Sequence, residues 1–337
     1  MTSTPVIQIP KTTSRPVDLI DLDASLLEQL GDLSNIQKAI PRIAKDPKLM
    51  QVIQEANSYL PSEHHLYLGD ARRMLNISPE SVHLILTSPP YWNLKSYNSM
   101  EGQMGDIENY DQFIHELDRV WEQCFQLLVP GGRLICVVGD VCLSRRKNKG
   151  RHSVFALHAS IQESCRRIGF DNLSPIIWHK IANATLEAKG NGAVFMGKPY
   201  EPNGIIKNDI EFILMQRKPG GYRKPSLAAK VLSIIPESDH REWFQQIWSN
   251  IPGASTRNHP APYPLELATR LIKMFSFVGD IVLDPFLGTG TTALAAASCG
   301  RNSIGYEIDP TYLQYAHDRL IHQLTSLFNT AKVFIYD

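Results

Sequence analysis

Apolar and polar residues alternate along this chain with two different periods. Short apolar runs of strand length lie between turn residues, at residues 66–68, 82–87, 134–138, 174–179, 210–216, 281–283 and 303–306. Stretches with helical spacing of apolar residues occur between them, at 71–76, 110–128, 152–168, 264–276, 291–299 and 310–327. The run 134–138 is apolar almost throughout, as expected in the middle of a parallel sheet. From residue 66 onward the pattern therefore predicts an α/β protein.

The first 60 residues follow a different pattern. Residues 1–17 are rich in Thr and Pro and have no periodicity, which predicts a loose arm. Apolar residues then recur at helical spacing over residues 21–60. Pro41 and Pro47 are expected to break this stretch into three short helices.

Two later stretches lack a clean period. Residues 181–209 are rich in Gly, Asn and Pro, and residues 217–258 combine turn residues with several aromatic residues. Such irregular sequence between strand-like runs predicts an insertion, which we place at residues 186–250.

The composition, 43% hydrophobic and 20% charged over 337 residues, is typical of a globular protein. No stretch approaches the ~20 apolar residues of a membrane span, and the N-terminus lacks the basic and apolar regions of a signal peptide. The five cysteines form no CxxC pair and the histidines show no HxxxH spacing, which indicates reduced thiols and no metal site. We therefore expect a cytoplasmic protein without a membrane partner.

The net charge is zero, but the charges are distributed unevenly. Residues 141–230 contain 16 Lys and Arg against 6 Asp and Glu, a local excess of ten positive charges. Such a region can bind a polyanion even though the whole chain is neutral. A basic loop directly follows a predicted strand and consists of Arg145, Arg146, Lys147, Lys149 and Arg151. This loop is either solvated or a clamp for phosphates, and we favour contact with a DNA backbone.

A first chemical motif, Thr-Ser-Pro-Pro-Tyr at residues 87–91, ends the apolar run 82–87. Open α/β sheets bind their ligands at the carboxyl ends of strands. Prolines stiffen this loop, Ser88 offers a hydroxyl group and Tyr91 offers an aromatic face. These groups suit a flat base that is held through its amino group.

A second motif consists of a strand, a glycine-rich turn and a helix. Gly288, Gly290 and Ala293 match the pattern G-x-G-x-x-[G/A]. Glu307 follows Gly288 by 19 positions, where an acid usually binds ribose hydroxyls. The glycines alone would suggest NAD, but Asp284 at the strand end would repel a pyrophosphate and attract an ammonium group. S-adenosylmethionine, a nucleoside that carries an amino-acid amine, fits better.

Together the motifs resemble those of amino-group DNA methyltransferases, in the permuted β group that places the catalytic motif before the cofactor motif. Residues 87–91 are similar to the family motif [Ser/Asp/Asn]-Pro-Pro-[Tyr/Phe], and residues 284–290 to its Phe-x-Gly-x-Gly loop. Residues 259–264 resemble the segment that lines the methionine end of the pocket, and residues 69–70 the acidic position beside the adenine. The resemblance covers most of residues 61–325. It implies a three-layer sandwich around a mostly parallel, seven-stranded sheet.

The resemblance also implies roles for individual residues. The catalytic residues would be Ser88, Pro89, Pro90 and Tyr91. The residues that bind S-adenosylmethionine would be Asp70, His259, Pro262, Asp284, Pro285, Phe286, Gly288, Gly290, Thr291 and Glu307. Asp70 can also be interpreted as the N-cap of a short helix. The implied partner is double-stranded DNA, with the target base flipped out of the helix.

Serine at position 88 resembles the N4-cytosine subgroup, since adenine-N6 enzymes usually carry Asp or Asn there. We therefore expect cytosine-N4 methylation, with adenine-N6 methylation as the alternative. No cysteine follows a proline, so the nucleophile of the carbon-5 cytosine methyltransferases is absent. An NAD-dependent oxidoreductase is disfavoured by Asp284, and an inactive DNA-binding module by the two intact motifs.

The expected organisation has four parts. Residues 1–60 form the arm and helical segment, 61–185 the catalytic half, 186–250 the target-recognition region and 251–337 the cofactor-binding half. The resemblance further implies a restriction–modification system. The oligomeric state, monomer or homodimer, stays open.

Overall fold

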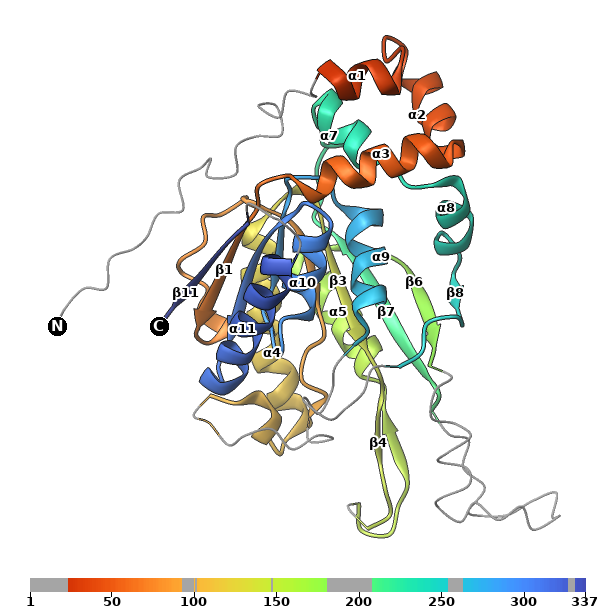
Figure 1. The fold of residues 1–337 in the computed structure, drawn as a ribbon. Helices are drawn as coiled ribbons and strands as arrows, with labels where there is room; N and C mark the ends of the chain where they lie inside the picture. Colours follow the sequence, from red (N-terminus) through yellow and green to blue (C-terminus); the bar gives the residue numbers. More distant parts are fainter. Residues whose placement is uncertain are drawn as a thin grey trace, which may run out of the picture.

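The computed structural model describes residues 24–92, 100, 102–146, 148–180, 208–253, 263–326 and 331–337 (Figure 1). These residues form one central nine-stranded sheet in the order β11-β1-β10-β9-β2-β3-β7-β6-β8. Its strands are β1 (Glu63–Leu68), β2 (Val82–Thr87), β3 (Leu128–Val138), β6 (Asp171–His179), β7 (Ile210–Arg217), β8 (Ile247–Trp248), β9 (Ile281–Asp284), β10 (Asn302–Glu307) and β11 (Lys332–Tyr336).

The sheet is mostly parallel, as predicted. Only β7 runs against its two neighbours, β3 and β6, and the other strand pairs of this sheet are parallel. The seven predicted strands are all present, and β8 and β11 extend the sheet at its two edges. β8 has only two residues, too few to show a period, and β11 pairs only with β1, which is distant in the sequence.

Helices cover both faces of the sheet and confirm the three-layer architecture. α4 (Tyr110–Leu127) and α5 (Leu157–Ile168) bury their apolar residues on one face. α9 (Leu265–Phe275), α10 (Thr291–Ser298) and α11 (Pro310–Ser326) pack on the other face. The short 3-10 turns η2 (Ala71–Arg73) and η4 (Met104–Asp106) lie in the loops that follow β1 and β2.

One predicted helix begins later than expected. Residues 153–155 form β5 (Ser153–Phe155), which pairs antiparallel with β4 (Val141–Leu143), so the helix starts only at Leu157. The hairpin β4–β5 carries the basic loop. In Figure 1 it extends beyond the carboxyl end of β3.

The N-terminal helices lie at the opposite edge of the sheet, above the amino ends of the strands in Figure 1. They are α1 (Ala24–Leu30), α2 (Ile36–Lys45) and α3 (Pro47–Ser58). The expected break at Pro41 is wrong, because Pro41 lies inside α2, where Ala39 and Ile43 are buried on either side of it. The break at Pro47 is confirmed, since this residue opens α3 and Asp46 caps it.

In the predicted recognition region, residues 186–250, residues 186–207 lie outside the described residues, and the remainder is divided between several elements. β7 belongs to the central sheet, whereas α7 (Leu227–Leu232) packs against α3 through Val231. α8 (Glu237–Trp243) lies nearby, and Trp243 is buried. The recognition role of this region stays a prediction.

The five cysteines carry free thiols, and four of them are buried. In the described part of the chain, no helix has both the length and the apolar character needed to cross a membrane.

Candidate active site

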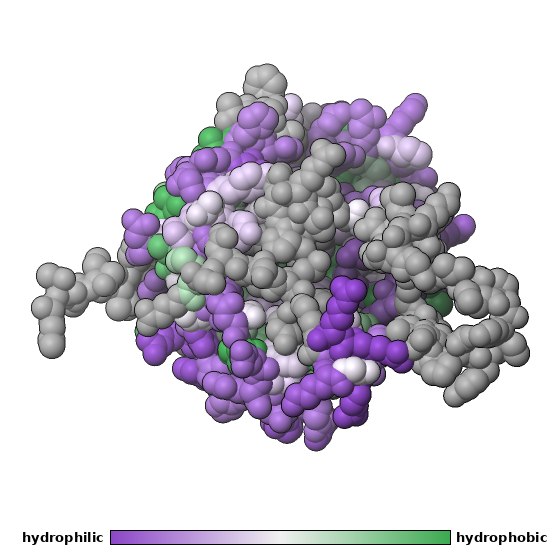
Figure 2. Space-filling model, turned by 90° about the horizontal axis from the view of Figure 1, so that it is seen from below, coloured by the Kyte–Doolittle hydropathy of each residue, from purple (hydrophilic) through white to green (hydrophobic). Residues whose placement is uncertain are grey.

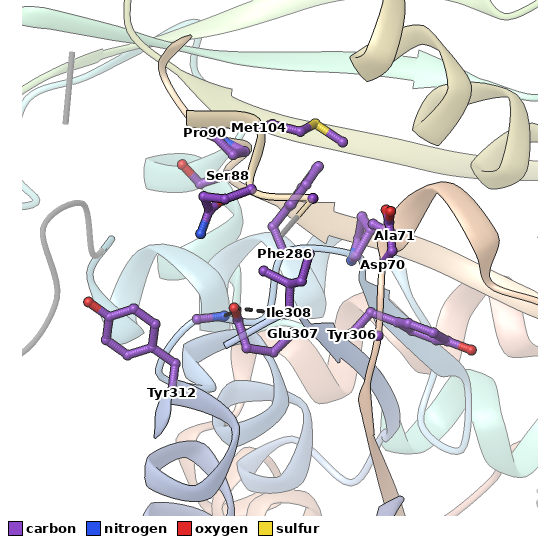
Figure 3. Close-up of a pocket in the computed structure, with 15 residues that line it drawn as sticks. Asp70, Ala71, Ser88, Pro90, Met104, Phe286, Tyr306, Glu307, Ile308 and Tyr312 are labelled. Carbon is purple, nitrogen blue, oxygen red and sulfur yellow. Dashed lines mark hydrogen bonds between the residues drawn. The ribbon is translucent and has the colours of Figure 1, made fainter. Parts of the chain in front are cut away.

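A cavity of about 640 Å³, counting its open mouth, lies at the carboxyl ends of β1, β2, β9 and β10. In Figure 3, Phe286 lies between Ser88 and Asp70, with Glu307 below it. The lining residues are Gly69, Asp70, Ala71, Ser88, Pro90, Gly102, Gln103, Met104, Pro285, Phe286, Gly288, Tyr306, Glu307, Ile308 and Tyr312.

The structure brings together many of the residues predicted from the two motifs. Those that line the cavity are Asp70, Ser88, Pro90, Pro285, Phe286, Gly288 and Glu307. Pro89, Tyr91, Asp284, Gly290 and Thr291 lie close by in sequence but are not among the lining residues. His259 and Pro262 lie outside the described residues.

Other lining residues were missed in the sequence. Tyr306 and Ile308 flank Glu307, so the acid's position at a strand end could have indicated both. Tyr312 lies in the first turn of α11, five positions after Glu307. Gln103 and Met104 belong to a loop without any period and gave no signal.

Glu307 is held in place by backbone N–H groups. Its Oε2 accepts a hydrogen bond from Gly288 N (2.7 Å), and its Oε1 accepts bonds from Ile308 N and Asp309 N (both 3.0 Å). Burial raises its pKa to about 7, although these N–H groups act in the opposite direction. Each carboxylate oxygen has two acceptor positions, so Glu307 can also accept hydroxyl groups from a ligand in the cavity.

Asp284 is buried behind the cavity wall and binds hydroxyl groups from separate segments. Thr87 Oγ1 donates to its Oδ1 (2.7 Å), Thr292 Oγ1 donates to its Oδ2 (2.5 Å), and Phe286 N donates to Oδ1 (3.0 Å). Tyr263 also donates to Oδ2, at 3.5 Å. Burial raises the pKa of Asp284 to about 6 against these bonds. The acid thus joins the catalytic loop, which begins after Thr87, to the cofactor loop. Its predicted contact with a ligand ammonium group stays a prediction.

Gly290 and Thr291 anchor the glycine-rich loop on α11. Gly290 has a φ of +77°, and a Cβ atom there would lie 2.9 Å from Cβ of Ala316. Both the left-handed backbone conformation and the lack of space for a side chain therefore require glycine at this position. Arg319 donates to Thr289 O (3.0 Å) and to Thr291 Oγ1 (3.2 Å). These contacts hold the glycine-rich loop against α11.

Asp70 fits both interpretations of its sequence. It caps η2 by accepting a hydrogen bond from Arg72 N (2.9 Å), and it also lines the cavity. Its carboxylate binds the Arg72 guanidinium through Nε and Nη2. Burial would raise the pKa of Asp70, but the hydrogen bonds and charge of Arg72 lower it overall. Asp70 is thus ionised and fixed at the rim.

The catalytic motif forms a compact turn at the end of β2. The Ser88 hydroxyl oxygen lies 3.3 Å from the Tyr91 hydroxyl oxygen, and the Tyr91 hydroxyl group also reaches Val137 O (3.5 Å) on β3. Pro89 and Pro90 are buried, which fixes the backbone between the two hydroxyl groups. Trp92 closes the turn by donating to Ile107 O (2.8 Å).

The predicted basic loop lies at the tip of the β4–β5 hairpin. Arg145, Arg146, Lys149 and Arg151 are exposed there, and Lys147 lies outside the described residues. Figure 2 shows this edge of the molecule from below, and its described surface is predominantly hydrophilic. The hairpin starts directly after the carboxyl end of β3, on the same edge as the cavity.

Comparisons with known proteins agree with this arrangement. Residues 82–318 match the N6/N4 methylase family model, described as DNA methylase. The type II methyltransferase M.MjaI of Methanocaldococcus jannaschii is 38% identical over 280 residues, which cover 74% of this chain and 88% of the relative. M.MthZI of Methanothermobacter thermautotrophicus, also a type II methyltransferase, is 32% identical over 283 residues, 77% of each protein.

Two solved structures are similar to the whole architecture. One is a Thermus thermophilus protein assigned as a DNA modification methylase and crystallised with S-adenosylmethionine. It is 50% identical, with a TM-score of 0.67 and coverage of 81% of this chain and 98% of that one. The other is the cytosine-N4-specific PvuII DNA methyltransferase, 18% identical with a TM-score of 0.55 and coverage of 83% and 96%. At that identity the second likeness concerns the fold alone, and it confirms the predicted fold class.

Proposed function

This chain belongs to the N6/N4 family of DNA methylases, and we propose that it transfers a methyl group from S-adenosylmethionine to the exocyclic N4 amine of cytosine in double-stranded DNA. The observation that carries this proposal is that Ser88 and Glu307 line one cavity. Ser88 belongs to the motif expected to hold the target amine, and Glu307 is the acid expected to hold the ribose. Direct transfer requires both ligands to meet in one such space.

The side chains that line the cavity suit the expected cofactor. Glu307 offers acceptor positions to ribose hydroxyl groups, while Phe286, Ile308 and Met104 offer apolar contacts to an adenine ring. Asp70, whose carboxylate is paired with the Arg72 guanidinium, lines the same cavity. When bound, S-adenosylmethionine supplies an electrophilic methyl group on a sulfonium sulfur.

The residues of the catalytic motif would activate the amine. The N4 lone pair of cytosine is delocalised into the ring, so the amine is a poor nucleophile. Acceptors that bind both N–H groups favour a more tetrahedral nitrogen, and Ser88 Oγ and the Pro89 carbonyl oxygen are the acceptors we assign. They would direct the lone pair at the methyl group, so that positioning provides most of the rate. Tyr91 would stack on the flipped base.

DNA contact is assigned to the β4–β5 hairpin. Its exposed arginines and lysine lie on the same edge of the molecule as the cavity, where phosphates flanking a flipped base would pass. Replacing Arg145 and Arg146 by Ala should weaken DNA binding and reduce its salt dependence by about one unit of slope per residue. Unchanged salt dependence would exclude this contact. Base choice would fall to residues 186–250, and the type II relatives favour a restriction–modification role.

The proposal is tested by methyl transfer from tritium-labelled S-adenosylmethionine to unmodified duplex DNA, followed by nucleoside digestion and mass analysis. We expect N4-methylcytosine. N6-methyladenine would establish the alternative target on the same scaffold, and the absence of label would refute both.

The variant Ser88→Ala tests the role assigned to the hydroxyl group. Because the hydroxyl group would act on the base, this variant should lose most of its transfer activity while binding S-adenosylmethionine almost normally. Loss of cofactor binding in Ser88→Ala would contradict the assigned role.

A further inference from the structure

An ion pair lies beyond the catalytic motif, at the same edge of the sheet. The cavity occupies the carboxyl ends of β1, β2, β9 and β10, and the same edge of the sheet continues over β3, β7 and β6. There, Lys180 Nζ donates to Glu211 Oε1 at 2.6 Å. Lys180 directly follows β6, and Glu211 is the second residue of β7, paired in register with Trp178. The Lys180 ammonium group also lies 5.2 Å from the centre of the Trp178 ring.

This ion pair lies next to Tyr91. A Cβ atom on Gly139, at the end of β3, would lie 3.4 Å from Glu211 Cγ and 3.7 Å from Tyr91 Cε2. The glycine therefore leaves a narrow gap between the aromatic ring and the acid. Tyr91 in turn reaches Ser88 through its hydroxyl group. The five groups form a row: Ser88, Tyr91, Gly139, Glu211 and Lys180.

The ion pair is more enclosed than a surface pair. The Lys180 side chain is 33% exposed and the Glu211 side chain only 13% exposed. Removing charges from water is costly, and such pairs often add little stability. A comparable pair, Arg217–Asp171, joins the same two strands at their other ends, with side chains 34% and 46% exposed. It is far from the site and offers a built-in control.

We propose that Lys180 recognises the O2 edge of the flipped cytosine, with Glu211 as the positioning residue that holds the ammonium group. This inference rests on the proposed function. N4, N3 and O2 follow one another along one edge of cytosine, and Ser88 is assigned to the N4 end. With N4 bound at Ser88, the O2 atom of cytosine would lie toward Lys180, where it could accept a hydrogen bond from the ammonium group. Adenine bound by its amino group presents a C–H group at the corresponding place.

The chemistry of the pair suits this task. A lysine ammonium group has three donors and no acceptor, so the bond to Glu211 leaves two N–H groups for a base. Glu211 orients the ammonium group, and the Trp178 ring stabilises this group through a cation–π contact. A Cβ atom on Gly139 would be in van der Waals contact with both Glu211 and Tyr91, so the glycine leaves the space between them free.

The test compares Lys180→Met with Arg217→Met in methyl transfer to unmodified duplex DNA. Loss of a hydrogen bond to a charged group predicts that Lys180→Met lowers kcat/KM for DNA about 10- to 100-fold. Arg217→Met should remain near wild type, and both variants should bind S-adenosylmethionine normally. Equal losses in the two variants, or a loss of cofactor affinity in Lys180→Met, would overturn the inference.

Variants of Glu211 test its role as the positioning residue separately. Glu211→Gln should reduce kcat/KM less than Lys180→Met, and the double variant should be no worse than Lys180→Met alone, because Glu211 would act only through the lysine. Independent, additive losses would exclude that role. The product of the wild-type protein separates a failure of the proposed function from a failure of this inference. If the wild type makes no N4-methylcytosine, the proposed function itself fails. If the wild type makes it and Lys180→Met is fully active, only the inference is refuted.

Discussion

Asp284 and Glu307 end neighbouring strands of the sheet, and burial raises the pKa of both, yet they face different partners. Asp284 is surrounded by hydroxyl groups from β2, α10 and Tyr263. Glu307 is held by backbone N–H groups of its own strand end and of the glycine-rich loop, and it lines the cavity. Two buried carboxyl groups thus differ in role: Asp284 joins two loops, whereas we propose that Glu307 binds a ligand.

The largest effect should follow from removing the acid that joins the loops. Asp284→Ala leaves the hydroxyl groups of Thr87 and Thr292 and the N–H group of Phe286 without their acceptor. At ~1 kcal/mol for each lost bond, we expect the free energy of unfolding to fall by about 3 kcal/mol. Urea denaturation measures this. A stable variant that loses only cofactor affinity would instead support the predicted contact with the ligand ammonium group.

The ligand-facing acid should behave in the opposite way. Glu307→Ala removes the acceptor proposed for the ribose hydroxyl groups, so affinity for S-adenosylmethionine should fall about 10- to 100-fold. Affinity for DNA should change little, since the acid lies inside the cavity. Calorimetry with each ligand separately provides the comparison. Equal losses for the two ligands would rule out the assigned role.

Substitutions of Thr87 test whether its hydrogen bond to Asp284 fixes the position of the catalytic loop. Thr87→Val keeps the shape of the side chain but removes the bond to Asp284, which should lower kcat about tenfold through a displaced Ser88. The affinity for S-adenosylmethionine should stay near wild type. Thr87→Ser restores the hydroxyl group and should recover most of kcat. A Thr87→Ser variant as slow as Thr87→Val would show that packing, and not the hydrogen bond, matters.

The smallest expected effect concerns pH. With a pKa of about 7, Glu307 is partly protonated in the free protein near neutrality. Ribose hydroxyl groups donate better to the ionised form, so binding should release a proton and affinity should rise with pH. The increase should be at most about tenfold per pH unit below pH 7 and should level off above it. Glu307→Gln should flatten this profile, and a profile that persists in the variant would assign it to another group.

The comparison also shows what sequence can reveal. Glu307 was recognised because its distance from the glycine-rich loop is fixed by one strand–helix–strand unit, which is local in sequence. The partners of Asp284 could not be foreseen, because Thr87 reaches it only through the pairing of β2 with β9, and Tyr263 reaches it from the segment before α9. Residues in loops without a period, such as Met104, were missed for the same reason. Seven of the nine strands of the sheet were predicted, because each of those apolar runs carries its own signal.

Two other differences have physical causes. Pro41 was expected to end a helix, but α2 continues because Ala39 and Ile43 are buried against α1 and α3. The start of α5 was placed too early because residues 153–155 pair with β4 in a hairpin, an interaction that helical periodicity does not indicate. In both cases tertiary contacts decided against a local preference.

The strand order also has a consequence for how the protein is made. Among the described residues β1 is the first strand, and its partners there are β10 and β11, the last two strands described. On the ribosome, β1 therefore has no partner strand until residues 302–307 have emerged. Likewise β2, which precedes the catalytic loop, gains β9 only after residues 281–284 have emerged. Until then these strands lack those partners, so folding of the sheet is expected to be late, slow and dependent on residues 281–307.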